Sequence, residues 1–171
     1  MTRILVVEGN SEELLARAEA DGRKPAWLAW SEAVRLHMPH AQTLLAFPYA
    51  PGRDTPPPTD FDAVILTGSG VAWSAADAPA RPYLDFIAPL IHSGRPVLGC
   101  CWGLQATSVL LGGNVSTNPR GSEVGIAHGI ELTDEGRRHP LYAGVDKRFD
   151  SVTWHWYHVT DLPPGAVVLA R

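Results

Sequence analysis

Short apolar runs, separated by longer mixed segments, occupy the first two thirds of the chain. Four of these runs predict strands, and they lie at residues 4–7, 43–47, 63–66 and 97–100. Each run is apolar at almost every position, which is typical of a strand covered on both faces in a parallel sheet. The runs therefore predict a buried, mostly parallel sheet at the centre of the fold.

Helical spacing of apolar residues predicts the elements between these strands. The predicted helices lie at residues 26–36, 81–92 and 104–111. Pro25 suits the first turn of the first helix, and Gly112 ends the third. Trp27 and Trp30 fall on one face of the first helix, so we expect them in the core and not in a ligand cage. The order of strands and helices predicts an α/β sandwich.

The remaining segments carry weaker patterns. The charged residues 11–24 predict a mobile loop with a helical turn, and residues 48–58, with five prolines in eleven residues, predict a loop of polyproline II character. Three further strands are expected at 123–132, 147–156 and 166–170, separated by turns at 134–136 and 163–165. No linker or repeat interrupts the chain, so we expect a single domain over residues 1–171.

The segment at the end of the fourth apolar run carries the strongest chemical signal. Gly99-x-Cys101-x-Gly103 lies between a predicted strand and a predicted helix, which matches the G-x-nucleophile-x-G elbow. Its glycines allow strand and helix to pack closely around a strained turn, so the central side chain projects above the sheet. Cys101 is therefore the predicted nucleophile, whereas Cys100 is expected to pack into the core.

The predicted elbow also suggests how the sulfur is activated. The amides and the positive dipole end of the following helix would favour the Cys101 thiolate. The backbone N–H of Trp102 would form one arm of an oxyanion hole. The chemistry indicated is acyl transfer through a thioester.

Composition excludes several other classes of function. The 171 residues carry a net charge of −4 with scattered basic residues, which gives no electrostatic case for binding nucleic acid or an anionic membrane. No apolar run is long enough to span a bilayer. The two adjacent cysteines form neither a disulfide framework nor a metal-ligand spacing. We therefore expect a cytoplasmic protein without cofactor or metal.

Four blocks of the sequence resemble the class I glutamine amidotransferases. The elbow block Gly99-x-Cys101-x-Gly103-x-Gln105 is the most specific of them. The other blocks are the first strand and loop at 1–10, the strand and glycine loop at 61–70, and the Trp-His and Leu-Pro-Pro-Gly-Ala segments within 154–166. Together they cover nearly the whole chain and are most similar to stand-alone, GMP-synthase-like members. The resemblance implies a flavodoxin-like three-layer sandwich with a nucleophile elbow.

The resemblance also implies an oxyanion hole. Its donors would be the backbone N–H groups of Trp102 and Ser69, the latter in the loop Gly68-Ser69-Gly70. This loop follows a predicted strand, where sites form in α/β folds. Gly70 stands where the family has proline, so the loop is expected to be more flexible.

Substrate contacts are implied at four further residues. Gln105 lies one helical turn after the nucleophile and would touch the substrate. His155, Trp156 and Tyr157 match the segment whose backbone holds the α-amino and carboxylate groups of glutamine. The family has a small residue at Trp156 and an aspartate at Tyr157. Two aromatic side chains there would reshape the pocket, so the expected substrate is glutamine or another γ-glutamyl small molecule.

The catalytic base of the family has no counterpart here. The family supplies it from a C-terminal His-x-Glu motif, and no His-x-Glu follows Cys101 in this sequence. Either the natural protein continues past Arg171, or it is a shortened homologue. We favour the first, because loss of that strand would expose a sheet edge. His155 and His158 are expected to be structural or surface histidines and not the base.

Three functions follow as hypotheses. The leading one is a glutamine amidotransferase-like cysteine hydrolase that cleaves a γ-amide through a γ-glutamyl thioester on Cys101, acting alone or with a separate synthase subunit that accepts ammonia. The second is a non-catalytic pseudo-amidotransferase that binds a partner or a small molecule. The third is a DJ-1/PfpI-like cysteine hydrolase, which Gln105 and the block at 154–166 disfavour.

Overall fold

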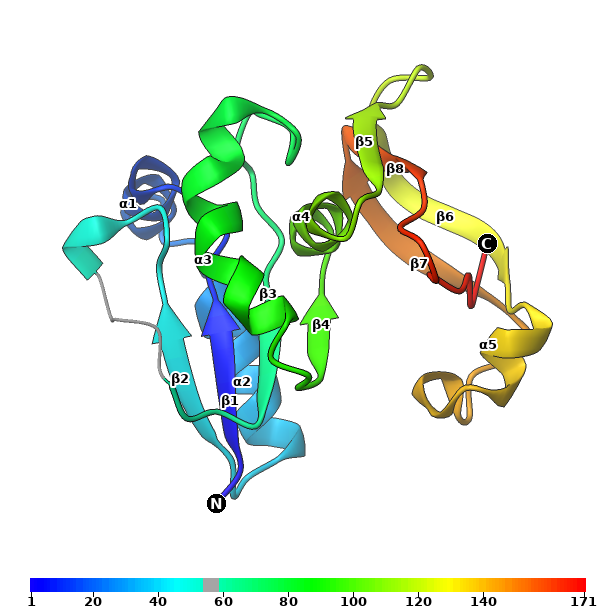
Figure 1. The fold of residues 1–171 in the computed structure, drawn as a ribbon, viewed down its shortest axis with the longest axis horizontal. Coiled ribbons are helices and arrows are strands. Elements are labelled where there is room, and N and C mark those ends of the chain that lie inside the picture. The colour runs from blue at the N-terminus through cyan, green and yellow to red at the C-terminus, as the bar shows by residue number, and fades with distance from the viewer. Residues whose placement is uncertain (54–58) are drawn as a thin grey trace.

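A computed structural model describes residues 1–53 and 59–171, and its first half is built on a parallel sheet (Figure 1). The strands are β1 (Arg3–Val7), β2 (Gln42–Ala46), β3 (Ala63–Leu66) and β4 (Val97–Gly99). Their order is β2-β1-β3-β4, with every neighbouring pair parallel. The four apolar runs are thus confirmed as strands. The predicted proline-rich loop includes a short 3₁₀ turn (Pro51–Arg53), and its residues 54–58 lie outside the described residues.

Helices cover both faces of this sheet. Along β1, Ile4 and Val6 face α2 (Ala26–His37), whose Val34 joins them in one core cluster. Leu5 and Val7 face the other way, into a larger core with α3 (Arg81–Ile91) and α4 (Trp102–Leu110). Trp27 and Trp30 pack against the first cluster, as predicted. The expected three-layer α/β sandwich is confirmed, with α3 in front of the sheet and α2 behind it in Figure 1.

Aromatic side chains join α3 to the start of α4. The rings of Tyr83 and Trp102 meet edge to face with centroids 4.7 Å apart, and Tyr49 stacks on Tyr83 at 5.6 Å. Tyr83 is fully buried, and this burial raises the pKa of its hydroxyl well above the usual value. Because Trp102 directly follows Cys101, this cluster anchors the residue that begins the elbow helix.

The prediction of a mobile loop at residues 11–24 was wrong. Helix α1 (Glu12–Ala20) forms there, and the hydroxyl oxygen of Ser11 accepts a hydrogen bond from the Leu14 N–H at 3.4 Å. Leu15 is 1% exposed and supplies an apolar anchor. The cap at Ser11 and the glutamates of the first turn favour the helix, a signal that the high charge of the segment obscured.

The second half of the chain forms two small antiparallel sheets beside α4 (Figure 1). One pairs β5 (Asn114–Thr117) with β8 (Tyr157–Asp161), and the other pairs β6 (Glu123–Glu131) with β7 (Arg148–His155). Trp156 lies between β7 and β8, so the chain passes from one sheet to the other at this residue. The strands predicted at 123–132 and 147–156 are confirmed, whereas β5 and β8 were not foreseen.

Two smaller predictions in this half were wrong. Residues 166–170 do not form a strand, because only Ala170 bridges to Leu132. The expected turn at 134–136 is the short helix α5 (Asp134–Arg138), capped by the hydroxyl oxygen of Thr133, which accepts from the Gly136 N–H at 3.0 Å. This helix packs against Leu169, whose carbonyl oxygen accepts a hydrogen bond from the Thr133 N–H at 2.9 Å. Among the described residues, no helix is both long and apolar enough to cross a membrane.

We predict that Gly103→Ala destabilises the fold at the elbow. A Cβ at this residue would lie 2.6 Å from the carbonyl oxygen and 2.7 Å from the Cβ of Leu66 on β3. Overpacking of this kind should lower the free energy of unfolding by about 1–3 kcal/mol, measured by urea denaturation. Gly52→Ala is the control, because no atom of the described residues, apart from those adjacent in the chain, lies within 4 Å of a Cβ built there. Equal midpoints for the two variants would contradict the prediction.

Candidate active site

Cys101 occupies a strained backbone conformation at the junction of β4 and α4. Its φ is 49° and its ψ is −108°, and it is the one non-glycine residue with positive φ among residues 1–53 and 59–171. Holding such a conformation costs of order 1–3 kcal/mol, which the surrounding packing must supply. Glycines make that packing possible, because a Cβ at Gly99 would lie 2.9 Å from the Leu104 backbone. The predicted elbow therefore exists in the structure.

The environment of the thiol differs from the expectation. The Sγ of Cys101 is directed at the carbonyl oxygen of Trp154, 3.8 Å away. Burial raises the pKa of the Cys101 thiol, the Trp102 N–H opposes that rise, and neighbouring Cys100 adds to it. The expectation that the helix terminus would make the thiolate the favoured form is thus corrected, since desolvation outweighs the single amide. Cys100 is half-buried, and burial raises its pKa as well.

The loop after β3 forms the wall facing Cys101. A Cβ at Gly68 would lie 3.5 Å from the Cβ of Cys101, so this loop packs directly against the elbow. The Ser69 hydroxyl donates to the carbonyl oxygen of Gly9 at 2.7 Å, and the Gly70 N–H donates to Oδ1 of Asn10 at 2.8 Å. Although Gly70 replaces the usual proline, these bonds hold the loop in place. The oxyanion role of Ser69 and Trp102 stays a prediction.

Glu8 is a buried carboxylate that the sequence reasoning did not single out. It is 1% exposed and accepts hydrogen bonds from the N–H and the side-chain amide of Asn10, at 2.9 and 2.8 Å. Its other oxygen accepts from the Trp27 N–H at the start of α2, at 2.8 Å. The Thr67 hydroxyl, 3.3 Å away, completes the group. Glu8 thus ties the loops after β1 and β3 to α2 and supports the wall that carries Ser69.

Gln105 and the segment 154–157 form the opposite wall. Gln105 is 6% exposed, and its side-chain amide donates to the carbonyl oxygen of Tyr157 at 2.9 Å. The Tyr157 hydroxyl reaches the carbonyl oxygen of Ala72 at 3.3 Å. The side chain of Trp102 points away into the core, so its backbone alone lies at the site.

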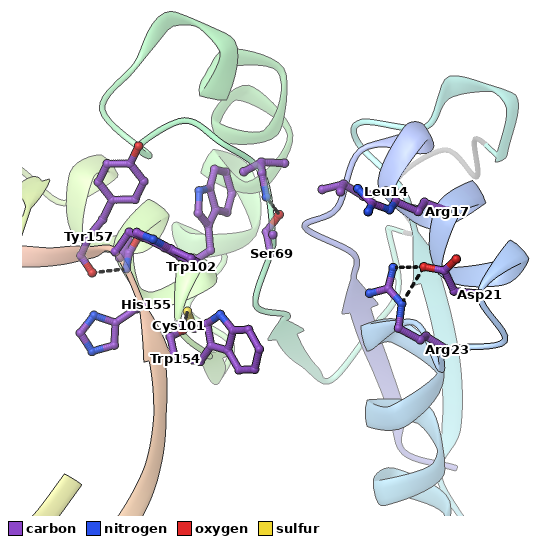
Figure 2. Close-up of a pocket in the computed structure, with 14 residues that line it drawn as sticks. Leu14, Arg17, Asp21, Arg23, Ser69, Cys101, Trp102, Trp154, His155 and Tyr157 are labelled. Carbon is purple, nitrogen blue, oxygen red and sulfur yellow. Dashed lines mark hydrogen bonds and ion pairs between the residues drawn. The ribbon is translucent and has the colours of Figure 1, made fainter. Parts of the chain in front are cut away.

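These walls enclose a cavity of about 470 Å³, drawn in Figure 2. Its lining includes Ser69, Gly70, Cys101, Trp102, Gln105, His155, Trp156 and Tyr157. The structure thus brings together eight of the nine residues predicted for the site, and Gly68 lines an adjoining cavity. Trp154, Arg17 and Arg23 also line the main cavity. Both arginines were missed because residues 11–24 were expected to be a loop. Arg17 lies on the capped helix α1, where its exposed side chain could have been considered, and Arg23 follows the helix.

His155 and His158 line a smaller cavity together with Cys101. The Nε2 of His155 lies 3.3 Å from an oxygen of Glu123 on β6, and its Nδ1 is buried without a partner among the described residues. His128 pairs with Asp150 at 2.7 Å, away from this cavity. No group of three or more histidine, cysteine, aspartate or glutamate side chains in the described part of the chain could hold a metal ion.

Fold and site together define a class of protein. A parallel α/β sheet whose strand ends in a strained cysteine elbow is an architecture that presents a nucleophile above the sheet. Residues 45–171 match the family model described as glutamine amidotransferase class-I. The chain therefore belongs to the class I glutamine amidotransferase family.

Curated relatives agree with this assignment. A gamma-glutamyl-L-1-hydroxyisopropylamide hydrolase from Pseudomonas sp is 32% identical over 99% of this chain and 59% of its own length. A GMP synthase [glutamine-hydrolyzing] from Thermomicrobium roseum is 35% identical over 63% of this chain and 19% of its own length. The chain thus spans about three fifths of the first relative and one fifth of the second.

Solved structures share the fold. A glutamine amidotransferase from Thermotoga maritima superimposes with a TM-score of 0.66 at 19% identity, covering 99% of this chain and 66% of the other. A glutamine amidotransferase from Methylobacillus flagellatus gives a TM-score of 0.58 at 20% identity, covering 99% and 60%. These likenesses establish the flavodoxin-like sandwich.

We predict that Cys101 reacts slowly at neutral pH and faster in alkali. In a Cys100→Ser variant, the rate of alkylation by iodoacetamide should reach half its maximum above the ordinary thiol pKa of about 8.5. The reason is that burial disfavours the thiolate, which is the reactive form. A synthetic peptide of residues 97–105 with the same substitution provides an unburied control. A half-maximal rate near pH 7 in the folded protein would contradict the prediction.

Proposed function

We propose that this protein is a cysteine hydrolase that cleaves the γ-amide of a γ-glutamyl compound through a thioester on Cys101. The observation that carries the proposal is the strained elbow, which projects Cys101 into a cavity walled by Ser69 and by the segment 154–157. A nucleophile needs an oxyanion site and a substrate pocket on either side of it. In this proposal the wall with Ser69 supplies the oxyanion site, and the wall formed by the segment 154–157 supplies the substrate pocket.

The proposed reaction has two halves. The Cys101 sulfur bonds to the γ-carbonyl carbon, and the carbonyl electrons move to oxygen, where the N–H groups of Ser69 and Trp102 stabilise the charge. As the intermediate collapses, the C–N bond breaks and the departing nitrogen receives the thiol proton. Water then attacks the thioester, the C–S bond breaks, and a proton returns to sulfur. The products are a γ-carboxylic acid and an amine or ammonia.

Proton transfer in this scheme requires a base, and the raised pKa of Cys101 increases that requirement. His155 and His158 are the imidazoles that line a cavity with the thiol within the described residues. The same raised pKa favours the second candidate function, a binding protein without catalysis. The two candidates differ in whether a thioester forms.

Two observations favour a γ-glutamyl amide over glutamine as the substrate. Trp154 and Trp156 line the cavity and are 66% and 52% exposed, so an apolar leaving group would find aromatic surface there. The gamma-glutamyl hydrolase relative matches 99% of this chain, whereas the GMP synthase relative matches 63%. We therefore propose hydrolysis without ammonia transfer as the main activity, and delivery of ammonia to a separate synthase subunit as the alternative.

We predict that Cys101→Ser abolishes release of amine from a γ-glutamyl alkylamide and abolishes labelling by a glutamine-mimicking electrophile. A hydroxyl oxygen is a far weaker nucleophile than a thiolate sulfur, and the partner found for the Cys101 side chain among the described residues is a carbonyl oxygen and not a base. The matched control is Cys100→Ser, which should keep most of the activity. Intact mass spectrometry and amine release provide the two readouts. Binding of the substrate by the wild type without turnover or labelling would favour the non-catalytic candidate.

We further predict that a γ-glutamyl alkylamide is hydrolysed with a higher kcat/KM than glutamine, by about tenfold. Burial of a few methylene groups against aromatic surface contributes roughly 0.8 kcal/mol each. Trp156→Ala should reduce this preference, whereas Trp30→Ala, which alters a tryptophan on α2 remote from the cavity, should not. Equal kcat/KM values for the two substrates would contradict the role given to the aromatic wall.

A further inference from the structure

The segment 154–157 lies at a junction between two sheets. His155 is the last residue of β7, in register with Glu123 at the start of β6, and Tyr157 begins β8, in register with Thr117 of β5. Trp156 between them belongs to neither pairing. At this segment the chain therefore leaves its pairing with β6 and begins its pairing with β5. Such a crossing between sheets needs contacts that fix the path of the chain.

On the cavity side, the elbow helix contacts this segment twice. The Cys101 thiol is directed at the carbonyl oxygen of Trp154, and the Gln105 amide donates to the carbonyl oxygen of Tyr157. The longer of these two contacts, 3.8 Å, is weak because sulfur is a poor donor. Neither of these two contacts involves His155 or Trp156, so other residues must fix the positions of those two.

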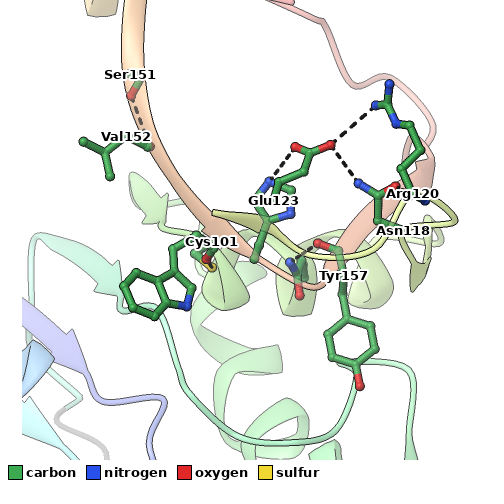
Figure 3. Close-up of polar contacts among 10 residues, drawn as sticks. Cys101, Asn118, Arg120, Glu123, Ser151, Val152 and Tyr157 are labelled. Atoms are coloured by element: carbon green, nitrogen blue, oxygen red, sulfur yellow. Dashed lines mark hydrogen bonds and ion pairs between the residues drawn. The ribbon is translucent and has the colours of Figure 1, made fainter. Parts of the chain in front are cut away.

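On the outer side, the Glu123 carboxylate holds the crossing. Figure 3 shows it facing Asn118 and Arg120. One oxygen accepts from the side-chain amide of Asn118 at 2.7 Å and from Arg120 at 3.4 Å. The other oxygen lies 3.3 Å from Nε2 of His155. Asn118 is 5% exposed, and its backbone N–H donates to the carbonyl oxygen of Trp156 at 3.0 Å.

The Glu123 contact also selects a form of the imidazole. An ionised carboxylate only accepts hydrogen bonds, so the Nε2 of His155 must carry a proton to bond with it. The Nδ1 of His155 is buried without another partner among the described residues. Neutral His155 therefore has Nε2–H and a bare Nδ1, and Glu123 is the group that makes this tautomer the favoured one.

We propose that Glu123 is a positioning residue of the site: its carboxylate orients His155 as the Nε2–H tautomer and, through Asn118, fixes the crossing at Trp156 against the elbow. The segment can then receive the γ-glutamyl group with its backbone already in place. This inference rests on the proposed function for its kinetic consequence, but the tautomer and the geometry do not depend on catalysis.

A change at Glu123 should affect substrate binding more than chemistry. Glu123→Gln keeps the shape of the side chain and one acceptor oxygen but loses the charge, and Glu123→Ala removes all three contacts. Preorganised contacts mainly lower the cost of binding, so KM for a γ-glutamyl amide should rise about tenfold in the Gln variant while kcat changes little. Glu131→Gln is the matched control, because Glu131 ends the same strand with an exposed side chain.

The decisive measurement is made on the full chain labelled with ¹⁵N-histidine. Wild-type His155 should show protonated Nε2 near neutral pH, and Glu123→Gln should shift it toward the other tautomer. The charged and titratable groups that neighbour His155 are Glu123 and Arg120 on one side, and Cys101, Tyr157 and His158 on the other.

Labelling rates separate this inference from the proposed function. Glu123→Gln should slow labelling by a glutamine-mimicking electrophile about tenfold and leave alkylation by iodoacetamide unchanged, because the latter needs the thiol but not the segment. An Nδ1–H tautomer in the wild type, or Gln variants at 123 and 131 with equal KM and labelling rates, would overturn the positioning role. If the wild type reacts no faster with the glutamine mimic than with iodoacetamide, the proposed function fails, and the tautomer measurement still tests Glu123.

Discussion

The rest of the site depends on one strained residue, Cys101. A side chain that projects above a parallel sheet at a strand-to-helix turn must take a positive φ, and the local backbone does not favour that conformation. The strain is offset by close packing of β4, α4 and β3, which glycines at 99 and 103 make possible. The aromatic contacts of Trp102 then hold the first turn of α4 in the core. Each of these supports therefore helps to hold the thiol at the cavity.

Each of the two walls around Cys101 is held by a carboxylate, buried in the case of Glu8 and partly exposed in the case of Glu123. Glu8 joins the loops after β1 and β3 to the start of α2, and Glu123 on β6 joins the turn after β5 to the end of β7, where the chain crosses between sheets. In each case one acidic side chain accepts several hydrogen bonds from segments far apart in the sequence. For Glu8 the constraint is strong, because a buried carboxylate is costly unless its oxygens accept hydrogen bonds.

These features belong to a chain of the class I glutamine amidotransferase family. The lining of its cavity includes Trp154 and Trp156, together with Arg17 on α1 and Arg23, which follows α1 and pairs with Asp21. In the function proposed above, the exposed aromatic surface accepts the leaving group of a γ-glutamyl compound bulkier than glutamine. A curated relative that matches nearly the whole chain is a gamma-glutamyl hydrolase.

The sequence by itself determined the parallel sheet and the elbow, because buried strands and tight glycine turns leave local patterns that need no distant partner. Most of the cavity lining was instead implied by the resemblance to the family. Prediction from the sequence failed at α1, where high charge obscured a capped helix, and at β5 and β8, whose pairing joins residues 40 to 47 apart in the chain. Tertiary structure alone decided the roles of Glu8 and Glu123, since a carboxylate acquires its function from the donors that folding brings to it. It also decided the protonation of Cys101: the helix terminus readable in the sequence favours thiolate, but burial, which only the fold creates, raises the pKa.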